Sequence, residues 1–226
     1  MLATTPVPAP LEVSRRDLRS LTADSEKRLL IALAKRLPRW IGPDHLTALG
    51  VLSMGAAGIC YRLLSVTPLA LLGVNLFLFL NWFGDSLDGT LARVREKQRP
   101  RYGFYVDHLA DAFGATFLLG GLATSGLVSP YAAIALLVSY LLLQIHIALK
   151  AHTTRVFQIA FWGIGGTEAR ILLATLNLGL LAFPSLLGGM TPMVWLLAAS
   201  LVGLVAADGV ATGRALDLEE RSRWSE

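Results

Sequence analysis

The sequence has little of what a disulfide-stabilised or zinc-binding protein needs. Its single cysteine, Cys60, excludes an intrachain disulfide, and the four histidines do not complete a Cys/His set of the kind that zinc sites use. Charged residues make up only 16% of the 226 residues, whereas 54% are hydrophobic and the mean hydropathy is +0.57. Such a chain is too apolar for an ordinary soluble domain.

The N-terminal segment lacks the pattern of a secretory signal. Residues 1–20 are polar and contain Pro and Arg, without an apolar core followed by a small-residue cleavage site. We therefore expect no signal peptide, and we expect residues 1–23 to form a disordered cytoplasmic tail.

Long apolar blocks dominate the rest of the chain. They predict six membrane spans, at residues 45–66, 68–91, 104–126, 130–151, 167–184 and 192–212. Each holds about 18–25 residues, enough to cross a hydrocarbon core about 30 Å thick. The predicted fold is an all-α integral membrane protein, with a six-helix transmembrane catalytic domain over residues 42–213.

Basic residues lie almost entirely on one side of these spans. They occupy the N-terminal segment, the second-to-third connection, the fourth-to-fifth region and the tail at 214–226, whereas residues 127–129 and 185–191 carry no charge. By the positive-inside rule, we expect a multi-pass protein of the plasma or inner membrane with both termini in the cytoplasm. We expect membrane lipids, and no nucleic acid, among its partners.

Residues 24–41 have the pattern of an amphipathic helix before the first span. Leu29, Leu30, Leu33 and Leu37 recur at helical spacing, and basic residues occupy much of the remainder. Such a helix is expected to lie in the interface of the cytoplasmic leaflet. A helix docked on the bundle is the alternative, and the sequence leaves it open.

Four aspartates lie at the end of the second span and in the first turns of the third: Asp85, Asp88, Asp107 and Asp111. Their spacings of three and four residues place each pair on one helix face. The short basic connection predicts antiparallel neighbouring helices, with the four carboxylates at one depth facing the cytoplasm. Carboxylates are expensive at a membrane edge, and hard oxygen ligands suit Mg²⁺, Mn²⁺ or Ca²⁺. We therefore predict a divalent metal site.

Small and basic residues accompany the aspartates. Gly89 removes a side chain beside the predicted metals, Ala92 is small, and Arg93 shares a face with Gly89 and can reach a phosphate. A diphosphate held by metal fits this setting, because metal neutralises the phosphoryl group and the leaving phosphate. An acceptor hydroxyl would need a base, for which a neighbouring carboxylate is the candidate.

The full pattern runs Asp85-x2-Asp88-Gly89-x2-Ala92-Arg93-x9-Gly103-x3-Asp107-x3-Asp111. It resembles the signature of the CDP-alcohol phosphotransferase (CDP-alcohol phosphatidyltransferase) family at all eight fixed positions. The resemblance, with the spans and the N-terminal helix, extends over roughly residues 24–212.

This resemblance implies transfer of a substituted phosphate from a CDP-alcohol, with CDP-diacylglycerol as the first choice, to an acceptor alcohol. CMP is released, in phospholipid biosynthesis. It implies a homodimer and two divalent cations, Mg²⁺ or Mn²⁺. By position, the four aspartates resemble metal ligands and Asp111 also the base. The positions that resemble nucleotide-binding residues are Gly89, Ala92, Arg93 and Gly103.

Several residues outside the motif are candidates for the acceptor or nucleotide site. Lys150, Arg155 and Arg170 could line an acceptor or phosphate pocket. Residues 43–47 are similar to a Pro-Asn-x-Leu-Thr segment of the family, but Asp44 replaces the Asn. A cap for the first span is an equal interpretation of Asp44.

Other functions stay open. The Asp107-His108 pair is similar to amino-alcohol phosphotransferases, which use CDP-choline or CDP-ethanolamine with diacylglycerol. An aspartate-rich prenyltransferase would also bind a diphosphate through metals, and a cation transporter would also place aspartates in the membrane. The nature of the released product and metal flux separate these classes.

Overall fold

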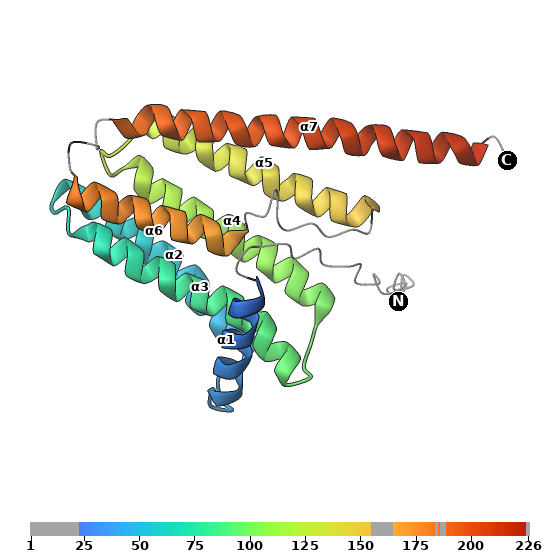
Figure 1. The fold of residues 1–226 in the computed structure, drawn as a ribbon, viewed down its shortest axis with the longest axis horizontal. Coiled ribbons are helices and arrows are strands. Elements are labelled where there is room, and N and C mark those ends of the chain that lie inside the picture. Colours follow the sequence, from blue (N-terminus) through green and yellow to red (C-terminus); the bar gives the residue numbers. More distant parts are fainter. Residues whose placement is uncertain (1–22, 155–164, 184, 186–188, 225–226) are drawn as a thin grey trace, which may run out of the picture.

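The computed structural model describes residues 23–154, 165–183, 185 and 189–224, and this part of the chain contains helices and no strand (Figure 1). A single turn of 3-10 helix, η1 (Leu63–Ser65), follows the second helix. The α-helices are α1 (Ala23–Arg36), α2 (Pro43–Arg62), α3 (Ala70–Val94), α4 (Pro100–Ala123), α5 (Pro130–Thr154), α6 (Gly166–Ala182) and α7 (Met190–Trp224).

Each expected span coincides with one helix, but only four of the described helices have the length and hydropathy of a membrane span. These are Pro43–Ser65, Ala70–Val94, Pro130–Thr154 and Met190–Ser222. The helix α6 has 17 residues, which at 1.5 Å per residue is about 25 Å, short of the hydrocarbon thickness. The helix α4 carries Asp107 and Asp111 in its first half, which lowers its hydropathy.

The helix α2 lies at the centre of the bundle and packs against both α3 and α4. On the other sides, α6 packs against α3, and α5 packs between α4 and α7 (Figure 1). The expected neighbours α3 and α4 both line the two hollows described below, but each packs mainly against α2 rather than against the other. The two aspartate-bearing helices therefore face one another across a space rather than through a tight seam.

Glycines allow the backbones of α2, α3 and α4 to approach closely. A Cβ on Gly84 would lie 2.5 Å from the carbonyl oxygen of Leu46 and 2.8 Å from the amide nitrogen of Gly50. On the other side of α2, a Cβ on Gly58 or Gly121 would collide with the backbone of the facing helix. Small residues at such crossings are how membrane helices gain packing without a hydrophobic driving force.

The helix α1 is docked on the bundle near the aspartates. It packs against α3, where Leu30 and Ala34 are buried in a cluster with Leu46, Leu87 and Leu91. The basic side chains of α1 at positions 27, 28, 35 and 36 are exposed. In the structure α1 is therefore docked on the bundle. Contact of α1 with the membrane interface stays a prediction.

Candidate functional site

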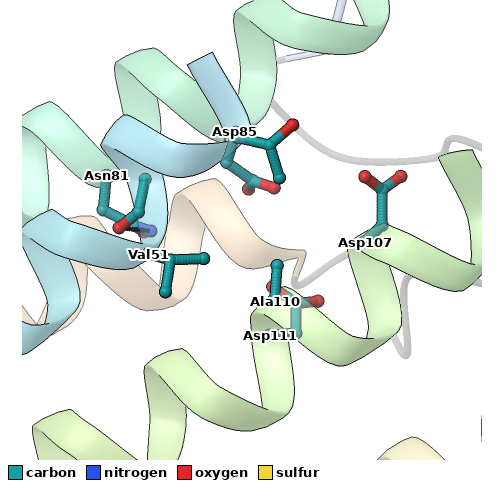
Figure 2. Close-up of a pocket in the computed structure, with 8 residues that line it drawn as sticks. Val51, Asn81, Asp85, Asp107, Ala110 and Asp111 are labelled. Carbon is teal, nitrogen blue, oxygen red and sulfur yellow. Dashed lines mark hydrogen bonds between the residues drawn. The ribbon is translucent and has the colours of Figure 1, made fainter. Parts of the chain in front are cut away.

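Two adjoining hollows lie where α2, α3 and α4 face one another, and they share Thr47 and Asp107. The first, which we name the aspartate hollow, is lined by Thr47, Gly50, Val51, Asn81, Asp85, Asp107, Ala110 and Asp111 (Figure 2). The second, the glycine hollow, is lined by Pro43, Asp44, Thr47, Asp88, Gly89, Ala92, Lys97, Arg99, Tyr102, Gly103, Val106 and Asp107.

Asp85 forms an ion pair with a residue that is far away in the sequence. The Nη2 atom of Arg170, in the second turn of α6, lies 2.6 Å from the Oδ2 atom of Asp85. The Nε atom of the same guanidinium donates to Oδ1 of Asn81 at 2.7 Å, and the amide of Asn81 donates to the carbonyl of Gly50 at 3.1 Å. A chain of polar contacts therefore joins α6, α3 and α2 beside the aspartate hollow.

Asp88 is turned toward α2 and is 7% exposed. Its Oδ2 atom accepts a hydrogen bond from the hydroxyl of Thr47 at 2.5 Å, and its Oδ1 atom accepts one from the backbone N–H of Gly89. Thr47 belongs to the segment that opens the first expected span. The segment around residues 43–47 therefore reaches the motif directly.

Asp111 is held from the other side, by α5. The side-chain amide of Gln144 donates to Oδ2 of Asp111 at 3.1 Å and to the hydroxyl of Tyr140 at 2.9 Å. The Asp111 carboxylate is therefore oriented by a neutral hydrogen-bond donor, the amide of Gln144. Asp111 also lines the aspartate hollow.

The four carboxylates line the two hollows but do not converge on one point. Among the described residues, no group of three or more His, Cys, Asp or Glu side chains is close enough to hold a metal ion. The donors are nevertheless oxygens only, which is the chemistry that Mg²⁺ and Mn²⁺ prefer. Asp107 lines both hollows, and Asp85 already has a cationic partner in Arg170. The residue types therefore fit divalent cations.

The small residues of the motif lie together on the glycine hollow. Gly89 and Ala92 come from α3, and Gly103 comes from the first turn of α4. A Cβ on Gly103 would meet nothing within 4 Å, and one on Gly89 would meet only the Arg93 guanidinium, at 3.6 Å. Arg93 is exposed beside Gly89, as the spacing predicts, and its Nη2 atom donates to the hydroxyl of Thr90 at 2.9 Å.

Asp44 lies at the rim of the glycine hollow and pairs with Arg99. The guanidinium of Arg99 also lies over the ring of Tyr102, 4.1 Å from the ring centre. The cap interpretation of Asp44 is wrong, because the N-cap of α2 is Gly42, whose N–H donates to the His45 ring at 2.9 Å.

The structure does not bring all three candidate acceptor residues to the hollows. Of the two candidates among the described residues, Arg170 reaches the hollows, through Asp85 and Asn81, and Lys150 does not. The ammonium of Lys150 lies 2.7 Å from Asp208 of α7, which also bonds the ring of His146 at 2.6 Å. Arg155 lies outside the described residues.

Sequence reasoning missed several side chains that support the motif. Asn81, which bonds Arg170, and Gln144, which bonds Asp111 and Tyr140, share one signal with Tyr140, which is a polar residue within an apolar run, where an unsatisfied polar group is costly. The residues at the rim of the glycine hollow lie in or beside the basic connection between α3 and α4 and carry no such signal; they are Lys97, Arg99 and Tyr102.

The helical fold, the membrane-length helices and the carboxylate-lined hollows define a class, a helical membrane protein with a polar site at one end of its bundle. The particular family follows from comparison with known sequences. The chain belongs to the CDP-alcohol phosphatidyltransferase family, whose sequence model matches residues 40–206. A comparison with individual curated proteins found no match.

Membership confirms the resemblance drawn from the motif. It makes the chain a transferase of the phospholipid-forming kind, with a CDP-alcohol and a second alcohol as substrates in a membrane lipid environment. The matched region begins just after α1 and includes both hollows and α6.

Proposed function

We propose that this protein transfers the phosphatidyl group of CDP-diacylglycerol to an acceptor alcohol and releases CMP. The observation that carries the proposal is the pairing of the two hollows. One is lined by carboxylates, the other by the small residues of the motif, and Asp107 and Thr47 line both. A nucleoside diphosphate could lie along both at once.

The nucleotide occupies the glycine hollow in this proposal. Gly89, Ala92 and Gly103 leave room on its walls, since none of them projects a side chain larger than a methyl group. Arg93, beside Gly89, contacts a phosphate oxygen, for which a guanidinium is well suited.

The four aspartates would hold two divalent cations, Mg²⁺ or Mn²⁺. When bound, these cations supply charge neutralisation for the diphosphate and for the leaving CMP. The release of Asp85 from Arg170 on loading would free the guanidinium to contact a phosphate or the acceptor. Lys150 and Arg155 stay further candidates for the acceptor site.

Asp111 accepts the proton of the acceptor hydroxyl. The acceptor oxygen then bonds to the phosphorus that carries the lipid, and the bond from that phosphorus to the CMP oxygen breaks. Gln144 orients the Asp111 carboxylate through its 3.1 Å hydrogen bond. The carboxylate lines the aspartate hollow and is a positioned base of the kind that such a reaction needs.

We further propose that all six helices α2 to α7 span the membrane, with the site and both termini on the cytoplasmic side, and that the protein acts as a homodimer. The distribution of basic residues supports the orientation. An aspartate-bearing α4 is tolerated as a span because its carboxylates face hollows and polar partners.

An amino-alcohol phosphotransferase is the alternative within the family. Its only support is His108, which follows Asp107 in the sequence. The ring of His108 bonds the backbone oxygen of Phe104 in its own helix at 2.9 Å and lines neither hollow. The position of His108 therefore adds no support to this alternative, and CDP-diacylglycerol stays the proposed donor.

Product analysis by mass spectrometry tests the proposal. Purified protein with Mg²⁺ or Mn²⁺ is given CDP-diacylglycerol plus a panel of alcohols in one arm, and diacylglycerol plus CDP-choline or CDP-ethanolamine in the other. We expect a new phospholipid and CMP in the first arm only, and loss of both when EDTA removes the cations.

Three other outcomes would contradict the proposed function and indicate another activity. Product in the second arm alone would establish the amino-alcohol alternative. Pyrophosphate released from a prenyl diphosphate would indicate a prenyltransferase, and metal flux into proteoliposomes without CMP would indicate a transporter.

A further inference from the structure

Glu26 of α1 joins three helices through one oxygen atom. Its Oε1 accepts a hydrogen bond from the indole N–H of Trp82 at 2.7 Å, from the hydroxyl of Thr167 at 2.9 Å and from the hydroxyl of Ser86 at 3.3 Å. Trp82 and Ser86 belong to α3, and Thr167 belongs to the first turn of α6. None of these contacts is needed for the reaction proposed above.

The hydrogen bonds of Glu26 lie next to those of Arg170. Trp82 follows Asn81 in the sequence and Ser86 follows Asp85, and Asn81 and Asp85 are the two α3 residues that bond Arg170. Thr167 lies three residues before Arg170, so the two face nearly the same side of α6. The start of α6 is therefore held to α3 at two neighbouring points, by Arg170 itself and by Glu26.

We propose that Glu26 is a positioning residue that fixes the first turns of α6 so that the Arg170 guanidinium stays at the aspartate hollow. The functional part of this inference rests on the proposed function, in which Arg170 serves the acceptor or its phosphate.

Two physical features make Glu26 suited to this role. Hydrogen bonds to an ionised carboxylate are stronger than those between neutral groups. The first turn of a helix has unpaired backbone N–H groups and is stabilised by a nearby negative charge. Among the described helices, α6 packs mainly on α3, and its hydrogen bond to α2, between Asn177 and Tyr61, lies well beyond the first turn, so few other contacts hold its start.

Removal of Glu26 should not detach α1, because Leu30 and Ala34 are buried independently of it. The variants Glu26→Ala and Glu26→Gln therefore test the hydrogen-bonding role. Lys35→Gln, at an exposed position of the same helix, is the matched control.

The first measurement needs no catalytic activity. Amide hydrogen exchange in detergent micelles reports the opening of the first hydrogen-bonded amides of α6, which begin with Ala169, whose N–H donates to the Gly165 carbonyl. We expect about tenfold faster exchange there in Glu26→Ala, partial recovery in Glu26→Gln, and no change in Lys35→Gln. Unchanged exchange in Glu26→Ala would overturn the positioning role, whether or not the proposed reaction occurs.

The second measurement is the Michaelis constant for the acceptor alcohol. Glu26→Ala should raise it about tenfold with a smaller effect on kcat, and should have no further effect in an Arg170→Ala background. Additive effects of the two substitutions would show that Glu26 does not act through Arg170. Absence of CMP release by the wild-type protein would instead refute the proposed function and leave the exchange result to decide the structural role.

Discussion

At the scale of single residues, the four motif aspartates look alike in the sequence but have different surroundings in the fold. Asp88 is buried against the Thr47 hydroxyl, Asp85 pairs with a guanidinium, and Asp111 accepts from a neutral amide. Only Asp107 lines both hollows. Asp111 lines the aspartate hollow and is oriented by a neutral donor, which is consistent with its proposed role as the base.

Asp111→Asn should separate catalysis from binding. The amide cannot take the hydroxyl proton, so we expect turnover to fall by about 10²–10⁴-fold, the usual contribution of a general base. Metal-dependent stabilisation by CDP, measured by thermal shift, should persist. Full activity in this variant would rule out Asp111 as the base.

Gly89→Val should weaken nucleotide binding without loss of stability. The added side chain would enter the glycine hollow, where a Cβ meets only the movable end of Arg93. We expect the Kd for CDP with Mg²⁺ to rise by tenfold or more, about 1.4 kcal/mol, and the melting temperature to change little.

Gly120→Val is its control, because a Cβ at Gly120 in α4 meets nothing within 4 Å and the residue lines neither hollow. Equal CDP affinity in the Gly89 variant and the wild type would argue against a nucleotide in this hollow.

At the scale of the helices, close backbone crossings and a few polar contacts decide how the bundle is built. The α2–α3 and α2–α4 crossings depend on glycine, whereas α6 and α7 are joined to their neighbours by hydrogen bonds. Asn75 and Asn177 join α3 to α6 at 2.8 Å, and Asp208 joins α7 to Lys150 and His146 of α5. Polar bonds of this kind between membrane helices contribute about 0.6–2 kcal/mol each.

Gly84→Ala should destabilise the bundle. The methyl group would lie 2.5 Å from the Leu46 carbonyl oxygen and 2.8 Å from the Gly50 amide nitrogen. Both are backbone atoms of α2, so no flexible side chain can move away. Overpacking of this kind costs about 1–3 kcal/mol, so we expect the melting temperature in detergent to fall by several degrees. Gly179→Ala in α6, where a Cβ meets nothing within 4 Å, should leave it unchanged. An unaltered melting temperature for Gly84→Ala would contradict the close crossing.

At the scale of the whole molecule, α1 and the connection between α3 and α4 lie at one end of the bundle (Figure 1). The glycine hollow is at this end too, because Lys97 and Arg99 of the connection line it. The connection from α4 to α5 lies at the other end (Figure 1). The charge asymmetry of the sequence coincides with this polarity, since the α3–α4 connection is basic and residues 127–129 carry no charge. A site that opens to the cytoplasm follows if the positive-inside rule holds here.

Cysteine labelling tests this orientation. In a Cys60→Ala background, Gln98→Cys reports the α3–α4 connection and Thr124→Cys reports the opposite end; both positions are exposed. A membrane-impermeant maleimide added to intact cells should label position 124, and should label position 98 only after permeabilisation. The reverse pattern would place the site on the outer side.

Features that depend on local sequence could be predicted from the chain alone. Long apolar runs specify helices because a backbone in hydrocarbon must satisfy its own hydrogen bonds. The motif spacing similarly placed each aspartate pair on one helix, and Arg93 beside Gly89. Six helices from α2 to α7 were expected, and each is present in the described residues.

Features that depend on contacts between distant residues required the tertiary structure. Only packing could show that α2 lies against both α3 and α4, because that arrangement comes from glycines on three separate helices. Packing of the helices also determines that Arg170 pairs with Asp85 and that Lys150 pairs with Asp208. It likewise brings Glu26 of α1 into hydrogen-bonding contact with α6. The sequence determined which side chains could do the chemistry, and the fold decided their partners, because hydrogen bonds and ion pairs depend on distances in space rather than on spacing along the chain.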